Sequence, residues 1–196
     1  MRASLTTATS LAALLVLGAC VETRPFNGVE LIPPDPAPQL SLTTAAGETF
    51  AVHEQEDSVV LLFFGYTHCP DVCPTTLADW SRARQALGEK AAGVRWVFVS
   101  VDPERDTPEV ADEYAKQFDS SFIGVSADSA TIAAIQEGFH ISAWRDPAPD
   151  DSPYTLTHSS QTFLVDRTGQ LRLLYPYGFT SEELAEDLAR LAIGGR

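Results

Sequence analysis

The chain has 196 residues, of which 44% are apolar and 20% are charged, a composition typical of one globular domain with short additional segments. Its formal net charge at pH 7 is -14, and the acidic residues are spread along the chain rather than grouped in one run. Nucleic-acid binding relies on a basic surface that contacts phosphates, so this charge argues against that class of function.

The first 19 residues have the pattern of a secretory signal peptide, because basic Arg2 precedes an apolar run that ends in small residues. The run is shorter than the ~20 residues that a membrane-spanning helix needs. Leu17–Gly18–Ala19–Cys20 also resembles a bacterial lipoprotein box, in which cleavage leaves Cys20 as a lipidated N-terminus. In the alternative, a plain secretory signal, Cys20 falls here by chance. The pattern therefore predicts an extracytoplasmic lipoprotein, anchored to a membrane through Cys20 and facing the periplasm in a Gram-negative host.

Proline is concentrated in the segment that follows, which includes Pro33, Pro34, Pro36 and Pro38. Such a composition favours an extended spacer between a membrane and a folded domain. In the alternative interpretation, Phe26–Gly28 and the neighbouring apolar residues dock on the domain. We therefore predict a signal peptide over residues 1–19, a lipidated N-terminus and linker over 20–39, and one domain over 40–196.

The first half of this domain predicts a hairpin followed by a β–α–β unit. Residues 40–52 alternate around Ala46–Gly47, which is typical of a β-hairpin. Residues 59–65 and 94–101 are continuous apolar runs, as expected of strands buried on both faces of a sheet. Between these runs, apolar side chains at helical spacing predict a helix over 75–87.

The second half predicts further short strands and helices. In chain order they are a helix from Pro108 capped by Thr107, a strand over 122–125, a helix over 129–137, a polar loop over 146–152, a hairpin over 162–175 and a helix over 180–191. This order predicts an α/β protein with a thioredoxin-like fold. Helices flank a mixed sheet, with an N-terminal β-hairpin and an inserted loop before His158.

Two cysteines, Cys69 and Cys73, remain once Cys20 is assigned to lipid. A close pair outside the cytosol is usually a redox disulfide or a soft-metal site. The pair follows a buried strand, at the sheet edge where α/β proteins collect their ligands. In helical geometry the four-residue spacing places both sulfurs on one face, and a helix N-terminus stabilises a thiolate. Two such thiolates suit Cu(I).

Three separated motifs carry a resemblance to a known family. They are Tyr66–Pro74 with its Cys-x-x-x-Cys-Pro pattern, Phe98–Thr107, and Leu156–Ser160. Together they resemble the Sco/SenC proteins, copper chaperones of cytochrome c oxidase assembly.

The resemblance implies that Cys69, Cys73 and His158 bind one copper ion per chain, as Cu(I) or Cu(II). It also implies delivery of copper to the dinuclear copper centre of the oxidase. The expected partners are the copper-binding subunit of the oxidase, and other copper chaperones or thioredoxin-like reductases.

Other polar residues near these motifs have less specific interpretations. Asp102 ends a buried strand, where its carboxylate either orients a ligand and tunes a thiol or caps the following turn. His68 is expected to be exposed or to lie behind the ligands, because adjacent side chains point apart. His53 and His140 carry no motif and are expected at the surface or in packing.

An enzymatic function competes with copper delivery. Cys69 and Cys73 would then be the redox pair of a specialised thiol–disulfide oxidoreductase that reduces the cysteines of the oxidase copper site. A general thioredoxin is less consistent with the sequence, because the spacing is Cys-x-x-x-Cys and Ser160 occupies the expected cis-proline position. A peroxiredoxin would need Pro and Thr at Leu62 and Tyr66, and a structural zinc site normally needs four ligands.

The lipoprotein box generates a first prediction. The protein should partition with membranes, and Cys20→Ser should remain unlipidated because the acceptor thiol is lost. Mass spectrometry of the N-terminus measures this, with Cys69→Ser as a control that leaves the box intact and should be lipidated. An unmodified N-terminus at another residue of the wild type would contradict the assignment.

Overall fold

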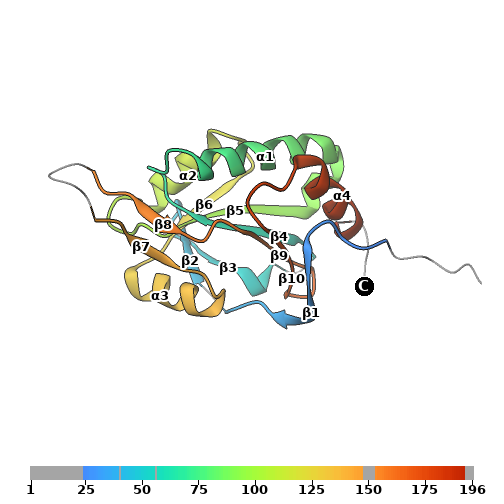
Figure 1. The fold of residues 1–196 in the computed structure, drawn as a ribbon, viewed down its shortest axis with the longest axis horizontal. Coiled ribbons are helices and arrows are strands. Elements are labelled where there is room, and N and C mark those ends of the chain that lie inside the picture. Colours follow the sequence, from blue (N-terminus) through green and yellow to red (C-terminus); the bar gives the residue numbers. More distant parts are fainter. Residues whose placement is uncertain (1–23, 40, 56, 148–152, 193–196) are drawn as a thin grey trace, which may run out of the picture.

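The computed structural model describes residues 24–39, 41–55, 57–147 and 153–192 (Figure 1). The predicted signal peptide and Cys20 lie outside the described residues. Among the helices that are described, none is long and apolar enough to cross a bilayer.

An eight-stranded mixed sheet forms the centre of the molecule. Its strands, from one edge to the other, are β1 (Val29–Pro36), β10 (Gln170–Tyr175), β9 (Thr162–Val165), β4 (Val59–Gly65), β5 (Val94–Ser100), β6 (Ile123–Ser126), β2 (Ser41–Thr44) and β3 (Thr49–Ala51). The three central strands β4, β5 and β6 run parallel, and the remaining neighbours pair antiparallel. The sheet is therefore mixed, as predicted.

Helices cover both faces of this sheet (Figure 1). Their bounds are α1 (Val72–Leu87), α2 (Pro108–Lys116), α3 (Ser129–Gly138) and α4 (Ser181–Leu191), with short 3-10 turns η1 (Val52–Glu54) and η2 (Gly88–Gly93). Apolar side chains of α1, α2 and α4 share one core with Leu61 and Phe63 of β4, whereas α3 shares the other core with Leu62 and Phe64. Burial on both faces explains why β4 is apolar at every position except its final glycine.

Helix caps follow the sequence signals closely. The Thr107 side chain accepts a hydrogen bond from the Val110 N–H at the start of α2. Thr180 and Glu183 form a complete capping box at the start of α4. α1 begins at Val72, three residues before the predicted start at 75, and therefore includes Cys73 in its first turn.

The N-terminal segment docks on the domain, the second of the two alternatives for residues 20–39. β1 lies within this stretch and pairs antiparallel with β10, so part of the expected linker belongs to the sheet. The backbone N–H groups of Asn27 and Gly28 each donate to the fully buried Asp187 carboxylate of α4, at 2.9 Å to Oδ2. The Arg190 guanidinium stacks on the Phe26 ring at 3.9 Å from its centre.

A second, two-stranded sheet was not predicted. β7 (Ala143–Arg145) pairs antiparallel with β8 (Leu156–His158). The polar loop expected at 146–152 lies between these strands, although residues 148–152 are outside the described part of the chain. The hairpin projects at the end of the molecule near the start of α1 and carries His158 as the last residue of β8 (Figure 1).

The buried Asp187 generates a second prediction, on stability. Asp187→Ala should lower the free energy of unfolding by about 2 kcal/mol or more, because it leaves buried backbone donors and the Tyr175 hydroxyl without their acceptor. Chemical denaturation measures this. Glu186→Ala removes the adjacent carboxylate, which is 58% exposed, and should change stability by less than about 0.5 kcal/mol. Equal effects of the two substitutions would contradict a docking role for Asp187.

Candidate metal centre

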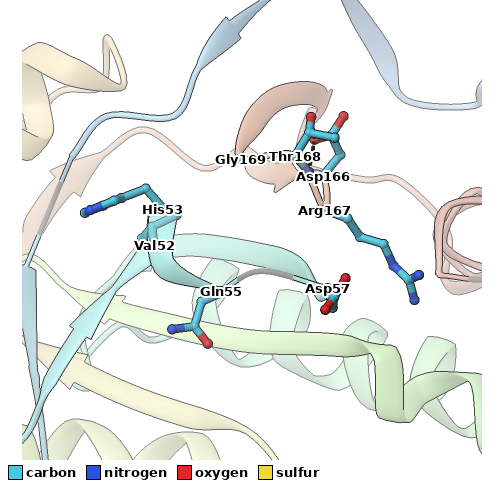
Figure 2. A pocket seen from close by; sticks show the side chains of 8 residues that line it. All are labelled: Val52, His53, Gln55, Asp57, Asp166, Arg167, Thr168 and Gly169. Atoms are coloured by element: carbon cyan, nitrogen blue, oxygen red, sulfur yellow. Dashed lines mark hydrogen bonds between the residues drawn. The ribbon is translucent and has the colours of Figure 1, made fainter. Parts of the chain in front are cut away.

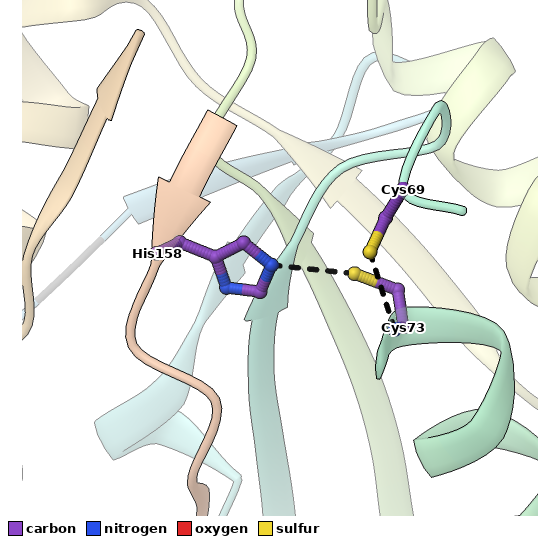
Figure 3. A group of neighbouring side chains, drawn as sticks. All are labelled: Cys69, Cys73 and His158. Atoms are coloured by element: carbon purple, nitrogen blue, oxygen red, sulfur yellow. Dashed lines mark hydrogen bonds between the residues drawn. The ribbon is translucent and has the colours of Figure 1, made fainter. Parts of the chain in front are cut away.

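Three potential metal ligands converge where β4, α1 and the β7–β8 hairpin meet (Figure 3). The sulfur atoms of Cys69 and Cys73 and a ring nitrogen of His158 all lie within 4.8 Å of one another. The structure therefore brings together the three residues that the family resemblance implied as ligands.

The loop between β4 and α1 places the two sulfurs. The Cys69 N–H donates to the Tyr66 carbonyl at 3.2 Å, which turns the chain after the strand. The Cys73 N–H, in the first turn of α1, then donates to the Cys69 sulfur at 3.4 Å. Cys73 is fully buried and Cys69 is partly exposed, and both are free thiols.

Gly65 makes room for the buried sulfur. A Cβ atom at this position would lie 2.7 Å from the Cys73 sulfur and 2.9 Å from the Phe98 ring. These separations are too short for a side chain larger than hydrogen, so the glycine that ends β4 is required by close approach rather than by a turn.

His158 approaches from the hairpin with a defined ring orientation. Its Nδ1 lies 2.9 Å from the Ser159 carbonyl oxygen, and its Nε2 lies 3.5 Å from the Cys73 sulfur. A carbonyl only accepts, so Nδ1 carries a proton, and in the neutral ring the Nε2 lone pair faces the sulfurs. The rings of Phe63 and Tyr66 pack edge-on against the imidazole, with centroids 6.1 and 5.7 Å away. A neutral imidazole in this tautomer is the form that binds a metal.

The hairpin is held in place by a stacked arrangement around Tyr154. The guanidinium groups of Arg105 and Arg145 lie over the Tyr154 ring, at 3.6 and 3.7 Å from its centre. The Tyr154 hydroxyl donates to Asp102 at 2.7 Å, and burial together with this carboxylate raises the pKa of Tyr154 to about 12. Asp102 also pairs with Arg105 at 2.6 Å.

Asp102 makes no hydrogen bond to Cys69, Cys73 or His158 and contacts their surroundings through other residues. The hydrogen-bond partners of its buried carboxylate, within the described part of the chain, are Arg105 and Tyr154. Its backbone carbonyl accepts from the N–H groups of Arg105 and Asp106 and closes the turn after β5. The His68 side chain is 55% exposed and does not join the ligand cluster.

The two thiols differ strongly in acidity. A hydrogen bond from the Cys73 thiol, together with backbone N–H groups of the loop, lowers the pKa of Cys69 to about 3 against the effect of burial. Burial, reinforced by the neighbouring Cys69 sulfur, raises the pKa of Cys73 above its ordinary value. The metal-free reduced site therefore holds one thiolate, on the more exposed Cys69, and one thiol, on Cys73.

A cavity of about 380 Å³ opens beside the cluster, between the cysteine loop and β8. Cys69 and His158 both line it, together with the apolar side chains of Val72 and Leu156. A group that enters this cavity from solution reaches the partly exposed sulfur and the imidazole directly.

Another hollow, of about 260 Å³, lies at the opposite end of β4 (Figure 2). It is lined by Val52, His53, Gln55 and Asp57 before β4 and by the 166–169 turn after β9. The His53 imidazole lines this hollow, but no described cysteine does. This hollow therefore lacks the donor set of the cluster at Cys69.

Comparison with known proteins identifies the family. A model of the SCO1/SenC family matches residues 33–193, which is most of the chain. The chain belongs to the SCO1/SenC family. The resemblance predicted from the three sequence motifs is thus confirmed, and the structural relatives of this SCO1/SenC protein confirm the thioredoxin-like fold.

Relatives of this SCO1/SenC chain include bacterial proteins and solved structures. The SCO2-like protein of Rickettsia felis is 35% identical over 143 residues, covering 72% of this chain and 70% of that protein. Apo Sco1 from Thermus thermophilus is 38% identical, with a TM-score of 0.77, covering 87% of this chain and 99% of that one. Bradyrhizobium japonicum ScoI with copper bound is also 38% identical, with a TM-score of 0.72, covering 78% and 97%.

Sequence reasoning missed the residues that hold the side chains of Cys69, Cys73 and His158 in place. In the sequence Gly65 is only the end of an apolar run. Nothing in the pattern indicates that it contacts Cys73, eight residues later. Arg105 lies within the Phe98–Thr107 motif, but the motif does not indicate that its side chain stacks on Tyr154. Tyr154 follows the polar loop and carries no motif, so its place between two guanidinium groups depends on the unpredicted hairpin.

The unequal thiols generate a third prediction, on pH dependence. The pKa of Cys69 in the folded protein lies below its ordinary value, so its thiolate persists from alkaline pH down to about 3. Alkylation of Cys69 by iodoacetamide in reduced, metal-free protein should change less than about twofold between about pH 6 and 8, where an ordinary thiol accelerates roughly tenfold per unit. Peptide mass spectrometry separates Cys69 from Cys73.

Cys73→Ala is the control for this measurement. It removes the thiol that donates to Cys69, so alkylation of Cys69 should regain a steep rise with pH. A steep rise already in the wild type would contradict the assignment of the thiolate to Cys69.

Proposed function

We propose that the protein is a metallochaperone that binds one copper ion through Cys69, Cys73 and His158 and delivers it to the dinuclear copper centre of cytochrome c oxidase. The convergence of two sulfurs and one imidazole nitrogen within 4.8 Å carries this proposal. Sulfur donors suit Cu(I), and imidazole also suits Cu(II). In support, Bradyrhizobium japonicum ScoI binds copper, and BsSco is a member of the Sco family of cytochrome c oxidase assembly proteins.

Loading this site releases a proton. Cys69 already provides a thiolate, whereas burial keeps the Cys73 thiol protonated in the metal-free protein. Copper binds thiolates, so the second sulfur becomes a ligand as its proton leaves. His158 contributes Nε2, the ring nitrogen that faces the sulfurs.

The site is open on the side from which transfer would occur. Cys69 and His158 line the cavity beside β8, whereas Cys73 lies on the buried side. Ligands of an acceptor protein can therefore replace Cys69 and His158 first while Cys73 still holds the ion. The copper-binding subunit of the oxidase is the proposed acceptor, and other copper chaperones or thioredoxin-like reductases are proposed to act before it.

The unequal thiols favour a second candidate function, reduction of the disulfide in the oxidase copper site. Thiol–disulfide exchange needs an exposed attacking thiolate and a second thiol that resolves the mixed disulfide. Cys69 and Cys73 have these two properties. The His158 imidazole, in contrast, is needed for copper but for no required step of exchange.

For the location we propose an extracytoplasmic lipoprotein, anchored through Cys20 and facing the periplasm in a Gram-negative host. The signal peptide and the box at residues 17–20 support this proposal from the sequence. The docked segment begins at Arg24, so three residues separate it from the cysteine proposed to be lipidated. The domain would therefore lie close to the membrane that holds it.

His158→Ala distinguishes the two functions and provides the fourth prediction. The variant should still form and reduce the Cys69–Cys73 disulfide, because both sulfurs remain. Its affinity for Cu(II) should fall about 100-fold, equivalent to about 2.8 kcal/mol, and its affinity for Cu(I) should fall less. Competition titration and disulfide exchange assays measure these properties, with His68→Ala as the control for an exposed imidazole next to the site.

The same variants decide the function in cells. In a strain that lacks the wild-type gene, His158→Ala should fail to support oxidase activity at low copper, whereas His68→Ala should support it. If His158→Ala restores the oxidase fully at low copper while Cys69→Ser does not, copper delivery is the wrong function and the reductase takes its place.

A further inference from the structure

A buried carboxylate lies behind the cysteine loop, at Asp106. Its side chain is completely shielded from solvent, and the residue lies in the turn between β5 and α2. The Thr67 N–H donates to Oδ2 at 2.9 Å, the Thr67 hydroxyl donates to Oδ1 at 2.6 Å, and the Ser100 hydroxyl donates to Oδ2 at 2.6 Å. Both carboxylate oxygens are therefore bound by donors from other elements.

These donors connect the cysteine loop to the sheet. Thr67 lies two residues before Cys69, whereas Ser100 is the last residue of β5. The Ser126 hydroxyl, at the end of β6, donates to the Asp106 backbone carbonyl at 2.6 Å. Asp106 is thus fixed to two strands of the sheet and contacts the loop through Thr67, 39 positions away in sequence.

The loop has few other fixed points between β4 and α1. Its described backbone hydrogen bonds are those from the Cys69 N–H to Tyr66 and, at the helix start, from the Thr75 N–H to Asp71. A buried charge is unfavourable unless it is fully hydrogen-bonded, and bonds to a charged acceptor are about twice as strong as neutral ones. The Thr67–Asp106 pair therefore attaches the loop that carries Cys69 to the sheet by two hydrogen bonds to a buried carboxylate.

We propose that Asp106 is a positioning residue of the copper site, which holds the Cys69 sulfur in register with Cys73 and His158 through Thr67. The proposal rests on the copper-binding function proposed above. Asp106 touches none of the three ligands, so it acts by fixing the backbone from which Cys69 extends. Loss of this attachment should loosen one side of the site and leave the His158 side, which the Tyr154 stack holds, in place.

Asp106→Asn tests the attachment with minimal change in volume. An amide has one accepting oxygen and a donating NH₂ group, so at least one donor from Thr67 or Ser100 would face another donor. Thr67→Val removes the hydroxyl from the loop side and leaves the carboxylate in place. Ser126→Ala is the matched control, because it removes a buried hydrogen bond to the same residue without touching the loop.

The measurements use the full chain and separate the loop from general stability. In metal-free protein, exchange of the Thr67 amide hydrogen should accelerate at least about tenfold in Asp106→Asn, relative to amides of β4 in the same variant. In copper-loaded protein, copper affinity should fall at least about tenfold, and the sulfur-to-Cu(II) charge-transfer bands should shift. Thr67→Val should change these properties in the same direction, and Ser126→Ala should lower only the melting temperature.

The outcomes distinguish this inference from the proposed function. If Asp106→Asn, or Thr67→Val should the first variant fail to fold, keeps the wild-type exchange rate and charge-transfer bands, Asp106 is only a core residue and the inference is overturned. The same conclusion holds if Ser126→Ala shifts the bands equally. If the wild type binds no copper at Cys69, the proposed function fails, and Thr67 amide exchange alone still decides whether Asp106 holds the loop.

Discussion

The Cys73 sulfur packs against the backbone of Gly65, and this contact determines where α1 can lie over the end of β4. β4 has apolar cores on both faces, so the chain that leaves it must turn towards one of them. The missing Cβ at residue 65 allows the first turn of α1 to approach on the side of Phe98. Once Cys73 is buried there, its N–H donates to the Cys69 sulfur and links the two sulfurs.

One short turn supports both halves of the site. Asp102 and Arg105 hold the hairpin that carries His158, through Tyr154. Asp106, in the same turn, holds the loop that carries Cys69. The turn follows β5, the parallel neighbour of β4, so the two halves share a common reference in the centre of the sheet. Cys69 and His158, from distant parts of the sequence, are in this way fixed relative to one another without contacting the same residue.

Much of this fold could be predicted because its signals are local. The apolar runs of β4 and β5 indicate strands buried on both faces, and Thr180 with Glu183 specifies the start of α4. The family motif also marks the two cysteines and His158. The β7–β8 hairpin could not be predicted, because strands of three residues show no clear alternation. The roles of Gly65 and Asp106 depend on contacts between elements, which no local pattern records.

The docking of Phe26–Gly28 on α4 also determines how the domain is presented. This N-terminal segment lies at one end of the long axis of the molecule, and the β7–β8 hairpin lies at the other (Figure 1). Because Asp187 fixes the segment, Arg24 lies at the end of the molecule remote from the cysteines. A surface attached to the N-terminus would thus lie on the opposite side from the sulfurs. A protein bound to the same surface would therefore contact the sulfurs only if it extended about the length of this domain away from the surface.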